Sequence, residues 1–224
     1  MKKLQMVIVL LLLIASISYS QLGIRGGLAL GTITGDNKTS IISESGTGTI
    51  DPTTRTGFTG GVSYRIGLIF GLAVEPGVYY VQSGSVYEIP NTSIVSNGTT
   101  ITISGKSVQN LDYLQIPVVA KFNLPIPIVS PYVEAGMAYS LLLSAKIKTD
   151  MTSSSNGISQ TFSDEKQIKD ITRKSDVSLV FGVGVEFIII DVNARLILGQ
   201  STLDVDGQKK AYNRTFMITA GLRF

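Results

Sequence analysis

The chain has 224 residues, of which 44% are hydrophobic and only 16% are charged, and its formal net charge is +3. It contains no cysteine and no histidine, which excludes a disulfide framework, a thiolate metal site and a cysteine-anchored lipoprotein, and removes the commonest general base. The 19 lysines and arginines stand singly or in pairs, so no basic patch indicates nucleic-acid binding.

Residues 1–20 have the three parts of a secretory signal peptide. Lys2 and Lys3 supply the positive start, residues 4–17 form an apolar core, and residues 18–20 (SYS) provide the small residues that a signal peptidase reads. We therefore expect cleavage before Gln21 and an exported domain comprising residues 21–224. The alternative interpretation is a single membrane helix, although the apolar run is short for a span.

Eight segments of the exported domain alternate apolar residues with small or polar ones, which is the pattern of a strand with one apolar face. In the last segment Phe216, Ile218 and Leu222 share one face, whereas Thr219 and Arg223 share the other. The segments are 22–33, 55–66, 71–82, 111–122, 131–146, 176–187, 191–200 and 213–224. Seven of them have ten to twelve residues, about the length that a tilted strand needs to cross a bilayer.

The connections between these segments alternate between long and short. Residues 34–54, 83–110 and 147–174 predict long polar loops and residues 201–212 a shorter one; Asn97-Gly98 predicts a small hairpin within the second. The fold class is therefore all-β, an eight-stranded antiparallel up-and-down transmembrane β-barrel with short periplasmic turns. Two prolines, at positions 76 and 117, oppose this assignment because proline lacks a ladder donor, and they require a bulge or a rim position.

The inward-facing positions of these strands collect five bases and four acids. They are Arg25, Arg65, Lys121, Arg195 and Arg223, and Glu75, Glu134, Glu186 and Asp191. Buried charges persist only when they are paired, and eight strands enclose a space that side chains can fill. We therefore expect a structural salt-bridge network that plugs the lumen. A proton or ion path through the same charges is the alternative.

Patterns that indicate catalysis are weak. Membrane-embedded hydrolases usually need a histidine near a serine or an acid pair, and this chain has no histidine. Glu134 and Glu186 could pair as carboxylates, but their place in the strand alternation fits a structural role. The loop acids Asp164, Glu165 and Asp170 lack the spacing of a calcium loop. We predict no catalytic residues, no metal site and no cofactor.

Five stretches form recognisable motifs: residues 23–28 (GIRGGL), 74–80 (VEPGVYY), 110–122 (NLDYLQIPVVAKF), 131–143 (PYVEAGMAYSLLL) and 182–187 (GVGVEF). Together they resemble the PorT-like outer-membrane β-barrel family of Bacteroidetes-type bacteria, over nearly all of the exported domain. The most specific motif is YLQIP followed by Lys121. The resemblance implies a barrel in the outer membrane, and members tend to carry prolines at both strand positions. The named member serves a secretion system that exports proteins across the outer membrane, a role that the resemblance does not transfer.

These observations predict a non-enzymatic outer-membrane protein that is structural or presents its loops to a partner. The alternatives are a component of an outer-membrane protein secretion or transport assembly, a small-solute channel and an envelope enzyme. Expected partners are outer-membrane lipid, the barrel-assembly machinery during insertion, and other envelope or secretion proteins. Phe224 is expected to be the terminal aromatic that the assembly machinery recognises, in the aromatic girdle at the periplasmic interface.

Overall fold

The computed structural model describes residues 21–35, 39–43, 46–96, 99–124, 126, 128–155, 158–203 and 210–224. Residues 1–20, for which a signal peptide is predicted, lie outside the described residues, and so does the predicted turn at residues 97–98. Among the described residues no helix is long and apolar enough to cross a bilayer.

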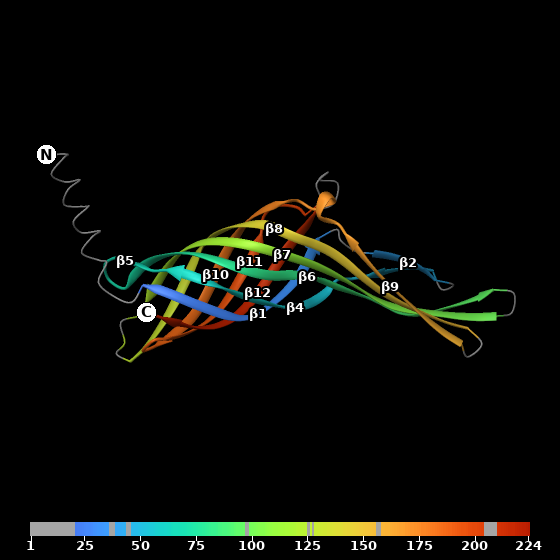
Figure 1. Ribbon diagram of the computed structural model, residues 1–224, viewed down its shortest axis with the longest axis horizontal. Helices are drawn as coiled ribbons and strands as arrows, with labels where there is room; N and C mark the ends of the chain where they lie inside the picture. Colours follow the sequence, from blue (N-terminus) through green and yellow to red (C-terminus); the bar gives the residue numbers. More distant parts are fainter. Residues whose placement is uncertain are drawn as a thin grey trace.

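Eight strands close into a ring, in which each pairs antiparallel with its neighbours (Figure 1). They are β1 (Leu22–Gly35), β4 (Thr53–Tyr64), β6 (Leu72–Ser96), β7 (Thr99–Asn123), β8 (Val129–Ser155), β10 (Ser175–Phe187), β11 (Ile190–Gly199) and β12 (Ala211–Arg223). The first and last strands join along a register from Gly23↔Arg223 to Gly35↔Ala211, and β8 pairs with β10. The predicted eight-stranded antiparallel barrel is confirmed.

The alternation of residue type along each strand fixes which face lies inside. Successive side chains of a strand point to opposite faces, so one register places the apolar set outside and the small or polar set in the lumen. Leu28, Met137 and Val183 project outward and are more than half exposed, whereas Ala29 and Val180, each on the other parity, are fully buried. Every strand of the ring contributes exposed apolar side chains to the outer surface. A continuous apolar outer surface is what a lipid-facing barrel requires.

Two of the predicted long loops are wrong over most of their length, because the chain there continues as strand, whereas the small hairpin predicted within the second is confirmed by the pairing of Ser93 with Thr102 and of Ser96 with Thr99. Residues 83–96 belong to β6 and residues 99–110 to β7, and the two strands pair as far as Ser96↔Thr99. Residues 147–155 extend β8, and β9 (Ile158–Gln167) folds back along it. These segments are rich in serine, threonine and other polar residues, so they show less of the alternation that marked the other strands. Figure 1 shows them projecting far beyond the ring.

The remaining connections contain little regular structure among the described residues. In the first long connection β2 (Thr39–Ser43) and β3 (Gly46–Ile50) form a separate hairpin, where a loop was predicted. The third connection ends in a single 3₁₀ turn, η1 (Lys169–Ile171). Both lie at the same end of the ring as the extended hairpins (Figure 1).

Both strand prolines sit where ladder pairing is interrupted. Pro76 lies opposite the break between β4 and the short β5 (Ile66–Gly67). Pro117 keeps its register with Ala138 of β8, but pairing with β6 is missing between Pro76↔Val118 and Tyr79↔Gln115. Their missing donors therefore cost few ladder hydrogen bonds.

Candidate functional site

All nine predicted inward charges lie in the lumen, close to the ends of the strands that short turns connect. Seven of them are buried, and Arg65 and Glu186 are partly exposed. They come from β1, β6, β7, β8, β10, β11 and β12 and from the residue between β4 and β5. Because the parity of each strand aims these side chains inward, barrel closure brings together residues far apart in the sequence.

Three acids and four bases form one continuous cluster. Lys121 contacts all three acids, with its Nζ 2.7 Å from Glu186, 3.3 Å from Asp191 and 3.5 Å from Glu75. Arg223 likewise lies 2.9 Å from Glu75, 3.3 Å from Glu186 and 3.4 Å from Asp191. Each of these two bases therefore compensates every acid of the cluster.

Arg25 and Arg65 complete this cluster. Arg25 lies 2.7 Å from Glu75 and 2.9 Å from Asp191, and Arg65 lies 2.9 Å from Glu186. Each carboxylate thus contacts three cations, which is the condition under which buried charges are tolerated.

The remaining pair, Arg195 and Glu134, is joined to the cluster by two uncharged side chains. Arg195 donates to both carboxylate oxygens of Glu134, at 2.7 and 3.1 Å. Asn193 donates to Glu134 at 3.1 Å and to the hydroxyl of Tyr132 at 3.0 Å, and that hydroxyl donates to Asp191 at 3.0 Å. All nine charges therefore belong to one hydrogen-bonded network.

Sequence reasoning did not single out the bridging residues. Tyr132 and Asn193 share the inward parity of their strands, and this parity is the signal that could have found them. Tyr132 has a second role, because the Nζ of Lys121 lies 3.4 Å from the centre of its ring, a favourable cation–π contact.

Two apolar layers fill the lumen beyond the charged network. The first consists of Ala29, Tyr79, Val81, Val119, Ala138, Val180, Ile197 and Met217. The second lies towards the extended hairpins and consists of Ile33, Leu111, Tyr113, Leu142, Ala145, Ile168, Leu203 and Ala211. A hydrated ion would have to shed its water to pass such layers, which is costly.

We therefore expect the purified protein to form no steady, large-conductance channel in planar lipid bilayers. The pairing of the charges and the two apolar layers both oppose the passage of a hydrated ion through the lumen. Steady openings that recur in independent preparations would contradict this expectation and favour the ion-path alternative. A porin treated in the same way serves as the positive control.

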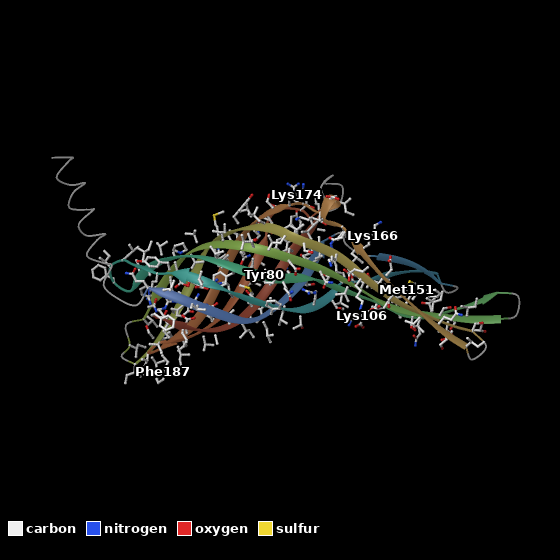
Figure 2. The ribbon with its side chains drawn as sticks, viewed as in Figure 1. Tyr80, Lys106, Met151, Lys166, Lys174 and Phe187 are labelled. Atoms are coloured by element: carbon white, nitrogen blue, oxygen red, sulfur yellow. The ribbon has the colours of Figure 1, made fainter. Side chains whose placement is uncertain are left out.

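The second candidate region is the part of the β-sheet that extends beyond the ring. We call it the external sheet: β6 from Tyr87, β7 as far as Asn110, β8 from Lys146, and all of β9. Lys106, Met151 and Lys166 mark it in Figure 2, well away from the barrel body where Tyr80 lies. Pairs of hydroxyls link its strands, including Ser93 with Thr102 at 3.0 Å and Ser154 with Ser159 at 2.7 Å.

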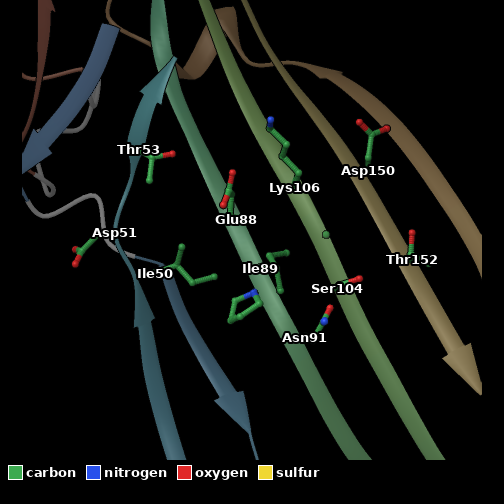
Figure 3. A pocket seen from close by; sticks show the side chains of 12 residues that line it. Ile50, Asp51, Thr53, Glu88, Ile89, Asn91, Ser104, Lys106, Asp150 and Thr152 are labelled. Carbon is green, nitrogen blue, oxygen red and sulfur yellow. The ribbon is translucent and has the colours of Figure 1, made fainter. Parts of the chain in front are cut away.

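A groove of about 830 Å³ lies between the external sheet and the chain entering β4 (Figure 3). Glu88, Lys106 and Asp150 form a row across β6, β7 and β8, and Ile50 and Asp51 lie on the opposite side. The hydroxyl and amide groups of Asn91, Ser104 and Thr152 also line it. Such a lining can hydrogen-bond a polar ligand or a peptide. Among the described residues no group of three or more acids is arranged to hold a metal ion.

The external sheet is rich in polar residues but also exposes apolar side chains, among them Ile158, which is 68% exposed, and one cross-strand pair. Met151 of β8 and Phe162 of β9 are register partners, and they are 37% and 64% exposed. Among the described residues β9 pairs along one edge only, with β8. An unpaired edge beside an exposed aromatic can accept a further strand.

Residues 14–203 match the family model described as "Outer membrane protein beta-barrel domain". Among solved structures, the chain is similar to Ail, the attachment invasion locus protein of Yersinia pestis, with 19% identity and a TM-score of 0.41 over 92% of this chain and 100% of that chain. It is also similar to OprG from Pseudomonas aeruginosa, with 13% identity and a TM-score of 0.42 over 92% and 96% of the two chains. At these TM-scores the likenesses support no inference about function. Comparison with curated proteins gives no significant match.

Proposed function

The chain belongs to the outer membrane protein β-barrel domain family, and from this premise we propose that it is a non-enzymatic barrel that presents its external sheet to a protein partner at the cell surface. The observation that carries this proposal is the external sheet itself. It extends β6, β7 and β8 beyond the lipid-facing part of the barrel and adds β9, where Phe162 is exposed beside an edge that is unpaired among the described residues. A barrel with only a structural role has no need of so long an extension.

The lumen supports the part of the proposal that opposes an ion path or a catalytic site inside the barrel. The nine predicted charges are engaged with one another, and two clusters of buried apolar residues lie beyond them in the lumen. Glu134 and Glu186, the two acids that could form a catalytic pair, are each held by cations. The lumen therefore serves as a rigid plug, and recognition takes place at the external sheet.

The resemblance to PorT-like barrels is finer than the family match and rests on the sequence motifs alone. It supports the alternative that this protein is itself a component of an outer-membrane protein secretion or transport assembly, and this alternative remains a prediction. Likewise, removal of residues 1–20 as a signal peptide remains a prediction, which N-terminal sequencing of the outer-membrane form would test by finding Gln21 first.

Replacing Phe162 by lysine is expected to abolish partner capture. Exposed aromatic anchors at interfaces cost about 2 kcal/mol or more when they are lost, which is roughly 30-fold in affinity. The measurement is affinity purification of the tagged protein from outer membranes of its own host, with the co-purifying proteins quantified by mass spectrometry.

Thr161→Lys is the matched control, because it adds the same charge to the opposite face of the same exposed strand. It should retain the partner. Equal loss from both variants would point to a non-specific charge effect, and capture of the same proteins by all three forms would contradict the proposed anchor. If no protein is captured reproducibly by the unmodified chain, the structural role replaces the partner-binding role.

A further inference from the structure

The three short turns at the end of the barrel opposite the external sheet are apolar. They contain Leu68, Ile69 and Phe70, then Leu124, Ile126 and Ile128, and finally Ile188 and Ile189, which lead into Ile190 at the start of β11. We call these nine residues the apolar tip. All of them are exposed, and Phe70, Ile128 and Ile188 are 88%, 71% and 77% exposed. Turns that project into water are normally built from polar residues and glycine, so this composition requires an explanation.

The backbone makes the composition more unusual. Phe70, Ile128 and Ile188 have φ angles of 56°, 76° and 56°, the left-handed region that disfavours bulky and β-branched side chains. Glycine or asparagine would occupy these positions with less strain. Each turn therefore carries one large, exposed apolar side chain at a residue whose backbone conformation disfavours such a side chain. An apolar environment around these three side chains would explain why large apolar residues occupy these positions.

The apolar tip is continuous with the lipid-facing surface of the barrel. Phe122, Phe187, Leu222 and Phe224 lie at the same end and are each at least 40% exposed, and Figure 2 shows Phe187 projecting outward there. Residues 66–72, 124–129 and 187–190 contain no charged residue. No charged ring therefore separates the tip from the lipid-facing surface.

Backbone groups of the turns are hydrogen-bonded within the protein. The amide of Leu68 donates to Leu72 at 2.7 Å, that of Leu124 to Pro131 at 2.9 Å and that of Ile126 to Leu124 at 2.8 Å. The carbonyl of Ile189 accepts from Arg223 at 2.8 Å. Internal partners for these groups are what a water-poor environment demands.

We propose that the apolar tip is seated in the headgroup region of the periplasmic leaflet, and that phospholipid is its occupant. The strands already span the hydrocarbon, so the tip reaches the boundary between headgroups and acyl chains, where interfacial apolar segments sink by about 5 to 10 Å. A second copy is disfavoured as the occupant, because copies in one membrane point their tips the same way. The tip would hold the barrel at a fixed depth and so fix the height of the external sheet above the surface.

Because the chain has no tryptophan, single Phe→Trp variants report on one position each. Phe70→Trp probes the tip, Phe181→Trp the middle of the barrel wall, and Phe162→Trp the external sheet. Each variant is refolded into vesicles of phosphatidylethanolamine and phosphatidylglycerol, without other proteins, and checked by heat-modifiable gel mobility. Tryptophan emission is then recorded with lipids brominated near the headgroup or deep in the chain, and with aqueous iodide.

The proposal expects Phe70→Trp to emit at shorter wavelength than Phe162→Trp, and to be quenched more by shallow than by deep bromines. Phe181→Trp should show the reverse preference for depth. Emission and iodide quenching of Phe70→Trp that match those of Phe162→Trp would overturn the proposal and leave the tip as a surface for a periplasmic protein. If Phe70→Trp does not fold, Ile188→Trp tests the same prediction on a different turn.

Discussion

Glu75→Ala is expected to lower the stability of the barrel by about 3 to 5 kcal/mol, the cost of removing one partner from a buried ion pair. Glu75 lies within 2.7 Å of Arg25, 2.9 Å of Arg223 and 3.5 Å of Lys121. Its loss leaves four cations against two acids in the larger cluster, inside a lumen where desolvation is severe. The measurement is urea unfolding in lipid vesicles, followed by the gel mobility of the folded form and by β-sheet circular dichroism.

The matched control is Glu165→Ala on the external sheet. Glu165 forms an ion pair with Lys146 at 2.7 Å, the same length as the contact between Glu75 and Arg25, but both partners are exposed. Exposed pairs contribute little, so this variant should unfold at nearly the same urea concentration as the unmodified protein. The hydrogen bond from Lys146 lowers the pKa of Glu165, so whatever the pair contributes is present at neutral pH and is lost as the pH falls through that lowered pKa. Equal destabilisation by the two variants would show that the lumen network is not what holds the barrel.

The strand parity of the barrel was predictable because its two environments differ so strongly. With lipid on one side and a packed lumen on the other, a one-residue slip would exchange every side chain. The positions of Arg25, Glu75 and Lys121 on the inner face follow from that rule alone. The pairing of these charges does not, because Arg25 contacts Asp191 across 166 positions of sequence, and that contact depends on how the ring closes.

The external sheet was not predictable from the same signal. Beyond the membrane both faces of the sheet meet water, so no alternation of residue type is needed. Serine, threonine and asparagine then indicate loops on composition, although strands there are held by ladder pairing and by cross-strand hydroxyl pairs such as Ser107 with Thr149 at 3.1 Å. Cross-strand threonine and serine contacts of this kind stabilise sheets. The strand ends near the turns were predicted to within a few residues, since the change of environment occurs there.

Deleting Phe224 is expected to reduce the folded protein in the outer membrane several-fold while leaving export intact. The side chain of Phe224 projects from the outer face of the barrel and is 57% exposed. Its amide donates to the carbonyl of Leu22 at 2.8 Å, and its carbonyl accepts from the amide of Leu22 at 3.1 Å, so it closes the last rung between the terminal strands. Deletion removes this rung together with the terminal ring that we expect the assembly machinery to recognise. Cell fractionation and heat-modifiable gel mobility measure the outcome.

Two further variants distinguish the role of the backbone hydrogen bonds of Phe224 from the role of its aromatic side chain. Phe224→Ala keeps the backbone hydrogen bonds and loses only the aromatic side chain, and Phe187→Ala removes a comparably exposed ring from β10 at the same end of the barrel. If the terminal ring is the recognition signal, Phe224→Ala should accumulate unfolded in the periplasm, whereas Phe187→Ala should insert normally. Both should refold equally well into pure lipid vesicles, where no machinery acts. Poor refolding of Phe224→Ala in vesicles would assign the defect to barrel stability, and normal outer-membrane levels of the deletion variant would remove Phe224 from the assembly signal altogether.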